Sequence, residues 1–318
     1  MKYWSLILGG FGVLCGLFMA THVDTHAASV TPYYTPKYQH SKMNGTKVLV
    51  DISGITNYSD WNVYQYHIGG RETNTIKLPN NYKYWLNRLK YHTDNKWYIH
   101  KVQTTVPNNY LSHVVNQFHA TAKDHNHFVN VHNLSKSEQK ELTLFTFNVI
   151  NHIRKQTKTA MVRVNQVAQI IGNDISNEYN KDDFSAFNGH DVPAVTRVAR
   201  KYGMMFDKTG KVQYYENTFV DSMFNNTVLN RVRFSDLKFF VYKCIAEFFF
   251  NDEDENQGHA LSVSGLMYYD FNPKVVYGAV DFDYTHADYD APALHFYTFE
   301  NVFINRKSTK KWLAHSGF

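Results

Sequence analysis

After residue 134 the apolar positions follow a helical period first and a period of two later. Apolar residues recur every three or four positions in residues 135–153, 162–179, 192–203 and 237–250, which predicts four helices. Ser135 and Glu138 have the spacing of a capping box at the first helix, and Ser235 with Asp236 predicts the start of the fourth. Asp191 and the proline that follows predict the start of the third helix, and Gly203 predicts its end.

Alternating apolar positions then predict three strands at residues 262–269, 275–284 and 293–299, separated by turns. Helices followed by antiparallel strands indicate an α+β fold in layers. We therefore expect residues 134–318 to form one domain around the very apolar helix 237–250.

The part before residue 134 predicts a small α/β N-terminal module, residues 46–133, made of two similar units. Residues 78–82 and 106–110 share the pattern apolar-Pro-Asn-Asn-Tyr, and each precedes apolar residues at helical spacing. Strands are predicted at residues 47–52, 97–102 and 128–131. Residues 29–45 lack any period and predict a linker.

The first 28 residues have the pattern of a secretory signal peptide. Lys2 precedes an apolar run over residues 6–20, and Ala27 and Ala28 follow as small residues at a cleavage site. A retained N-terminal anchor is the alternative. The rest of the sequence shows no second apolar span, so we expect a secreted protein, extracellular or associated with the cell wall, without a stable membrane span after cleavage.

Composition narrows the classes of partner. The net charge is +5 and the pI about 8.9, which indicates either anionic cell-wall polymers such as teichoic acids as partners outside the cell or a role in solubility alone. No arginine-rich run or RNA-stacking motif occurs, so nucleic acid is not expected as a partner. Cys244 is the single cysteine beyond the signal peptide, so no internal disulfide forms there, and its apolar neighbours predict a buried thiol rather than a nucleophile.

The candidate functional residues lie in two Gly-His pairs and in the segment between them. His190 and His259 each follow a glycine, Glu216 lies between them in a Tyr-Glu-Asn triplet, and Glu247 is an acid inside the apolar helix. Two imidazoles and two carboxylates are suited to holding a divalent metal such as zinc or to moving protons. His190, Glu216, Glu247 and His259 are therefore the candidate cavity residues, and His190, Glu216 and His259 the candidate metal ligands; no catalytic residue is assigned.

Two other clusters are weaker candidates. The histidines at positions 119, 125, 127 and 132 match no metal-ligand spacing and are predicted to lie in a polar loop. The alternating acids 281 and 283, with 288 and 290, lack the glycine and terminal glutamate of a calcium loop. We expect these acids to be turn and edge-strand residues in water.

The ordered motifs resemble a known family. Residues 134–154, Gly-His-Asp-Val-Pro-Ala-Val at 189–195 and Tyr-Tyr-Glu-Asn at 214–217 are similar to the surface-exclusion (PgrA-type) domain of lactobacilli and enterococci. That domain is in turn similar to the CAP superfamily of cysteine-rich secretory proteins, antigen 5 and pathogenesis-related proteins. The resemblance covers roughly residues 134–285 and implies a CAP-like α-β-α sandwich.

The resemblance also implies roles for single residues. His190 and His259 match the two cavity histidines of CAP proteins, and Glu216 matches the acid of their Gly-Glu-Asn motif, although Tyr215 replaces the glycine. Glu247 matches the acid of the preceding helix, with Asp252 or Glu253 as alternatives. The chain departs from the family after His259, where Ala-Leu-Ser-Val replaces the usual aromatic and glutamine, and it lacks the family disulfides.

Three hypotheses for function follow. The first is a cell-surface protein of surface-exclusion type, which binds cell-wall polymers or another cell's surface without turnover. The second is a metal-dependent hydrolase that uses the histidines and acids. The third is a protein that binds an apolar ligand such as a lipid. The sequence does not predict the oligomeric state.

Overall fold

The computed structural model describes residues 38–43, 46–51, 65–68, 74–106, 115–220, 230–252, 255–284 and 292–318. The predicted signal peptide lies outside these residues, and so does most of the predicted linker. Within the described ranges, no helix has the length and apolarity needed to span a bilayer.

A four-stranded sheet forms the centre of the C-terminal part. Its strands are β6 (Val162–Val164), β9 (Val276–Asp283), β10 (Ala293–Glu300) and β7 (Glu216–Val220), in that order. β9, β10 and β7 pair antiparallel, whereas β6 pairs parallel to β9. Strands β9 and β10 were predicted from their alternating pattern and are confirmed.

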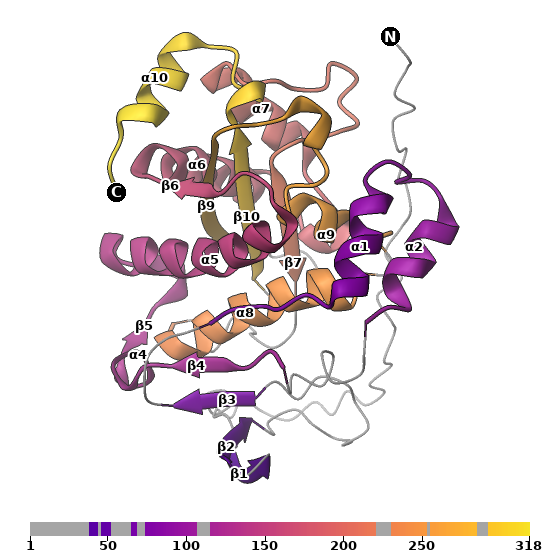
Figure 1. Cartoon of the computed structure of the whole chain (residues 1–318). Helices are drawn as coiled ribbons and strands as arrows, with labels where there is room; N and C mark the ends of the chain where they lie inside the picture. The colour runs from indigo at the N-terminus through magenta and orange to yellow at the C-terminus, as the bar shows by residue number, and fades with distance from the viewer. Residues whose placement is uncertain are drawn as a thin grey trace, which may run out of the picture.

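Helices cover both faces of this sheet (Figure 1). On one face lie α5 (Lys136–Thr157) and α8 (Phe234–Phe250), where Phe147 packs directly over Gly278 of β9. On the other face α6 (Gln166–Asp182) packs so closely that Gly172 leaves no room for a side chain against Ala279 and Tyr297. With α7 (Val192–Tyr202) packed on α6, the layers form the predicted α-β-α sandwich.

The helix boundaries follow the predicted capping residues in two cases. Ser135 and Glu138 form the reciprocal hydrogen bonds of a capping box at the start of α5. Asp191 Oδ1 accepts a hydrogen bond from the Ala194 N–H at the start of α7, and Gly203 ends this helix with a φ of 66°. Only glycine adopts such a backbone conformation without strain, which explains why this helix ends there.

Four local predictions were wrong. Residues 97–102 belong to a helix, α2 (Lys96–Gln103), whose buried Ile99 and Val102 have helical spacing. Residues 262–269 are not a strand: α9 (Gly258–Val263) is followed by a 3-10 turn, η3 (Tyr269–Phe271). The predicted helix 162–179 begins late, because 162–164 pair with β9 as β6. Helix α8 begins at Phe234 with Arg233 as its N-cap residue, so Ser235 and Asp236, the predicted capping residues, lie inside its first turn.

The N-terminal part packs on α8. A second sheet contains β1 (Tyr38–Met43), β2 (Thr46–Asp51), β3 (Gln65–Ile68) and β4 (Phe118–Ala120), and β5 (Phe128–Val129) pairs with β8 (Val232–Arg233). The helices are α1 (Asn80–Leu89), α2 and the short α4 (Ala122–Asn126). Strand β1 lies within the residues predicted as a linker, and part of the second predicted repeat, residues 107–114, lies outside the described residues.

Aromatic contacts join this part to the C-terminal part. The ring of Tyr82 in α1 meets that of Phe249 edge-on, with a centroid distance of 6.4 Å. The ring centroid of Phe118 in β4 lies 5.4 Å from that of Phe239. One hydrophobic core therefore includes α1, α2, β4, α5 and α8. The boundary drawn at residue 133 between two domains stays a prediction.

The remaining elements of the described residues are short. They are the 3-10 turns η1 (Val131–Asn133), η2 (Ala186–Asn188) and η4 (Asn301–Phe303), and the C-terminal helix α10 (Lys307–His315). Cys244 lies fully buried in α8, as its apolar neighbours predicted.

Candidate functional site

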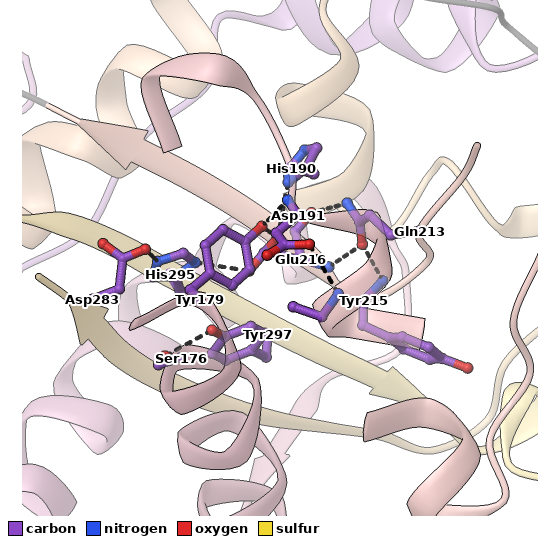
Figure 2. A network of polar contacts seen from close by, with 11 residues as sticks. Ser176, Tyr179, His190, Asp191, Gln213, Tyr215, Glu216, Asp283, His295 and Tyr297 are labelled. Atoms are coloured by element: carbon purple, nitrogen blue, oxygen red, sulfur yellow. Dashed lines mark hydrogen bonds and ion pairs between the residues drawn. The ribbon is translucent and has the colours of Figure 1, made fainter. Parts of the chain in front are cut away.

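The Glu216 carboxylate is the centre of a buried polar network (Figure 2). Its Oε2 atom lies 2.9 Å from His190 Nδ1 and accepts a 2.5 Å hydrogen bond from the Tyr179 hydroxyl. Its Oε1 atom lies 2.7 Å from Nδ1 of His295 in β10. The structure therefore brings together two of the four predicted cavity residues, and it adds a tyrosine and a histidine.

The backbone around Glu216 is held by Gln213. The Gln213 side-chain oxygen accepts hydrogen bonds from the N–H groups of Tyr215 and Glu216, each at 2.8 Å, and its amide donates to the Glu216 carbonyl at 2.8 Å. Tyr215, which stands where CAP proteins have a glycine, is buried and donates its hydroxyl to the Met205 carbonyl at 2.6 Å. These contacts fix the direction in which the Glu216 carboxylate leaves β7.

The loop before α7 delivers His190. Gly189 has a φ of 95°, a conformation that side chains rarely tolerate, which explains the glycine of the first Gly-His pair. Next to His190, the Asp191 N–H donates a 2.7 Å hydrogen bond to the Tyr179 hydroxyl, whose own proton goes to Glu216. Tyr179 therefore ties the start of α7 to the carboxylate.

His295 is enclosed between two carboxylates on the face of the sheet covered by α6. Its Nε2 atom lies 3.1 Å from Asp283 Oδ2, an ion pair whose geometry is not that of a hydrogen bond. The side chains of His295 and Glu216 are 0% exposed and that of Asp283 is 1% exposed. Charge, rather than solvent, must stabilise these groups.

The pKa values follow from this enclosure. Burial alone would lower the pKa of His295, but the charges of Asp283 and Glu216 outweigh it and raise that pKa to about 10. Burial would likewise raise the pKa of Glu216, but the His295 charge and the hydrogen bonds from both histidines lower it to about 2. At neutral pH the centre of the network is therefore the His295 imidazolium paired with the Glu216 carboxylate.

His259 belongs to a second pair. Its Nδ1 atom lies 2.7 Å from Asp252 Oδ1, while Asp252 Oδ2 accepts hydrogen bonds from the N–H groups of His259 and Ala260 at 3.0 and 3.3 Å. The His259 ring stacks on Phe248 of α8 at 4.4 Å. Burial opposes the charge on His259, but Asp252 outweighs it and raises the pKa of this histidine.

The acid bonded to His259 is therefore Asp252, which the sequence offered only as an alternative to Glu247. Glu247 lies in the last turn of α8 and is largely buried. The second Gly-His pair also differs from the first in its backbone, because the positive φ values fall on Asn256 and Gln257 and not on Gly258.

A metal site is not preformed by these side chains. Among the described residues, no group of three or more His, Cys, Asp or Glu side chains is arranged to hold a metal ion. Both Glu216 oxygens already accept side-chain hydrogen bonds, and the Nδ1 atoms of His190 and His259 face different carboxylates. The assignment of a metal to His190, Glu216 and His259 stays a prediction.

The acids of β9 were placed wrongly by the sequence. Asp281 and Asp283 were expected in water at a turn or edge, but β9 is an inner strand and Asp283 is buried against His295. Burial raises the pKa of Asp281 to about 6.

The histidine cluster is dispersed over several contacts. His127 Nε2 lies 2.7 Å from Glu138, and the His132 ring packs on Tyr284 at 4.1 Å. These two histidines attach the N-terminal part to α5 and to the end of β9.

The comparisons with known proteins bear on the fold. No protein-family model matches the sequence, and no curated protein does. A solved structure described as the CAP domain of Enterococcal PrgA is similar, with a TM-score of 0.55 and 18% identity over 74% of this chain and 90% of that chain.

This chain has the CAP-domain fold. The resemblance to a PgrA-type CAP domain, inferred from the motifs around His190 and Glu216, is confirmed at the level of the fold. The matched share of this chain is larger than residues 134–318 alone provide, so the likeness includes some of the N-terminal part.

Proposed function

We propose that this CAP-domain protein acts outside the cell by binding, as a protein of surface-exclusion type, and that it contacts the cell wall or a neighbouring cell without turnover. The observation that carries the proposal is the closed state of the Glu216 network. Three side chains bond the Glu216 carboxylate, and its exposed fraction is 0%.

A general base or a nucleophile must reach its substrate within hydrogen-bond distance. The Glu216 side chain has no exposed atom to offer, and the side chain of His295, its strongest partner, is equally buried. His190 keeps some contact with water, since its side chain is 30% exposed, but its Nδ1 is engaged with Glu216. This arrangement supports a structural role for the network, in which it joins β7, β10, α6 and the start of α7.

Two further facts support a surface role. The structural neighbour is a CAP domain of Enterococcal PrgA, and this chain carries a net charge of +5, which suits anionic wall polymers. The predicted signal peptide would place such a protein where those polymers are.

Binding to purified Gram-positive cell walls tests the proposal. The protein lacking residues 1–28 is mixed with walls at low and at high salt, and the bound fraction is measured by sedimentation. We expect binding at low salt that weakens as salt screens the charges. His190→Ala and His259→Ala, if folded, should bind as the parent protein does, because neither residue is assigned to the contact. Absence of wall binding at low salt refutes the proposal.

The same variants test the hydrolase hypothesis, which stays a prediction. Elemental analysis of protein purified without chelator should find a stoichiometric metal that both substitutions remove if that hypothesis holds. The apolar-ligand hypothesis also stays a prediction, and native mass spectrometry for a co-purified lipid tests it.

A further inference from the structure

A cluster of aromatic rings lies on α1 and α2, away from the Glu216 network; two of its rings are exposed and two are partly buried. We call it the α1–α2 aromatic surface; it comprises Tyr84, Trp85, Trp97 and Tyr98 with the cations Arg88 and Lys101. Tyr84 and Trp97 are 53% and 52% exposed, although both are large and aromatic, whereas Trp85 and Tyr98 are partly buried. Such exposure of adjacent aromatic rings is typical of a binding surface.

The rings form a continuous series. The Tyr84 ring centroid lies 5.0 Å from that of Trp85, Trp85 lies 5.3 Å from Trp97, and Trp97 lies 4.9 Å from Tyr98. Each pair meets nearly at right angles, with interplanar angles of 81°, 86° and 87°. The rings hold one another in place, so little conformational entropy is lost when a ligand packs on them.

Two further features extend this surface at the turn between the helices. The ring of Tyr98 stacks on that of His92, with a centroid distance of 4.2 Å. His92 in turn lines an open hollow of about 490 Å³ that residues 91–96 form. Just before this turn, Lys90 Nζ lies 4.9 Å from the ring centroid of Tyr91 and 4.5 Å from that of Tyr269. Figure 1 shows α1 and α2 side by side at the edge of the molecule, as their packing requires.

The charges around the rings are almost all positive. Residues 74–106 include six lysines and arginines and one acid, Asp94. Arg88 lies 5.6 Å from the Tyr84 ring centroid and Lys101 lies 5.4 Å from that of Trp97. Within the described residues, neither cation forms an ion pair with a carboxylate, so both charges are available to an anionic partner.

The aliphatic side chains of both helices are buried. Leu86, Leu89, Ile99 and Val102 all pack in the core, so aromatic rings and cations, rather than aliphatic groups, meet the solvent. A membrane-binding helix would also present aliphatic side chains to the bilayer. Ring faces carry partial negative charge and attract the weakly positive C–H groups of sugars, and Arg and Lys bind phosphate or carboxylate.

We propose that the α1–α2 aromatic surface binds an anionic polysaccharide, with sugar rings packed on Tyr84 and Trp97 and its acidic groups paired with Arg88 and Lys101. The proposal rests on the proposed function, which places the protein outside the cell, where it meets such polymers in the cell wall. It names the surface that makes the contact, and this surface lies outside the His190 and Glu216 region.

Calorimetric titration of the full chain without its first 28 residues tests the proposal. The probes are polygalacturonate and a purified wall teichoic acid whose polyol-phosphate backbone carries sugar substituents, with neutral dextran, inorganic polyphosphate, oligo(dT) and anionic phospholipid vesicles as comparisons. We expect both anionic sugar-bearing polymers to bind, in a salt-sensitive manner, and dextran to bind far more weakly.

Substitutions then assign the site. Trp97→Ala and the pair Arg88→Gln with Lys101→Gln should each weaken polysaccharide binding about tenfold. The matched control is Trp312→Ala with Lys311→Gln, an exposed aromatic–basic pair on α10, far from α1 and α2 (Figure 1). This control should bind as the parent protein does, and circular dichroism verifies that every variant is folded.

Several outcomes overturn the proposal. They are unchanged affinity in both α1–α2 variants, equal loss in the α10 control, equal binding of dextran, or tighter binding of polyphosphate, oligo(dT) or vesicles than of either polysaccharide. Retained binding to whole walls alongside any of these results would refute this surface and leave the proposed function standing.

Discussion

Replacing His295 by leucine should destabilise the protein strongly, although the leucine side chain is apolar and similar in size to the imidazole. His295 is the cation between Glu216 and Asp283, at 2.7 and 3.1 Å, and none of the three has appreciable contact with water. Leucine would leave two buried carboxylates facing each other without the charge that stabilises them. Removing one partner of a buried ion pair typically costs about 3–5 kcal/mol.

The pKa of Glu216 gives a second route to the magnitude. It lies at about 2, against an ordinary value of 4.5. At ~1.4 kcal/mol per pKa unit, this difference corresponds to about 3 kcal/mol of stabilisation of the ionised carboxylate. The charge of His295 is the largest of the causes that lower this pKa, and His190 contributes to the shift as well. Both routes therefore give a loss of a few kcal/mol in the free energy of unfolding for His295→Leu.

Urea unfolding followed by tryptophan fluorescence measures this loss, and its pH dependence identifies the cause. The pKa of His295 is raised from 6.5 to about 10, so its contribution is complete below pH 6.5 and disappears as the pH rises through 10. The pKa of Glu216 is depressed, so its contribution is present above pH 4.5 and disappears as the pH falls through 2. The difference between parent and variant should be largest from pH 4.5 to 6.5.

The double variant His295→Leu with Glu216→Gln provides the control. Removing the Glu216 charge should recover part of the lost stability, because one of the two carboxylates that faced the His295 cation is gone. A loss below about 1 kcal/mol, or a loss that stays constant from pH 5.5 to pH 10, would refute the charge-based account of the network.

Two other predictions concern packing and a second buried ion pair. Gly172→Ala should cost about 1–3 kcal/mol, because its new Cβ would lie 2.8 Å from the Ala279 Cβ, despite the gain of about 1 kcal/mol in helix propensity. Thermal melts measure both effects: Gly258→Ala, whose Cβ meets nothing within 4 Å, should be nearly neutral, and equal stability of the two variants would contradict this packing argument. Lys238→Met should cost about 3–5 kcal/mol in urea unfolding, since it leaves Asp124, 2.8 Å from the buried ammonium, without this cation. Adding Asp124→Asn should restore part of that loss, and no recovery would argue against the pair.

Local signals in the sequence were sufficient where the structure is decided locally. The capping box at Ser135, the cap at Asp191 and the stop at Gly203 depend on residues three or four positions apart. The alternation in β9 and β10 was visible for the same reason. The pairing of His190 with Glu216 followed from family motifs, not from spacing.

Features that depend on distant pairing were not predicted. Residues 162–164 have a helical pattern, but they pair with β9, more than a hundred residues later. His295 becomes a partner of Glu216 only through the register of three strands, in which β10 lies between β7 and β9. One signal was available: in the predicted hairpin of strands 275–284 and 293–299, a histidine alternates with apolar residues, and two acids lie on the neighbouring strand.

The choice between Asp252 and Glu247 depended on the turn between α8 and α9. The chain turns at Asn256 and Gln257, both with positive φ, and this brings the Asp252 carboxylate to the N–H groups at the start of α9. Neither residue is a glycine, so the sequence contains no strong indication of this turn.

The burial of α8 bears on whether residues 134–318 can be separated from the N-terminal part. All of its residues are buried except Lys243 and Phe250, so the helix is covered on every side. The sheet and α5 cover part of it, while Phe118 of β4 and Tyr82 of α1 cover another part. A fragment cut at residue 134 would expose that apolar flank and aggregate, so any transplant of this CAP domain into another protein has to carry the preceding helices and strands with it.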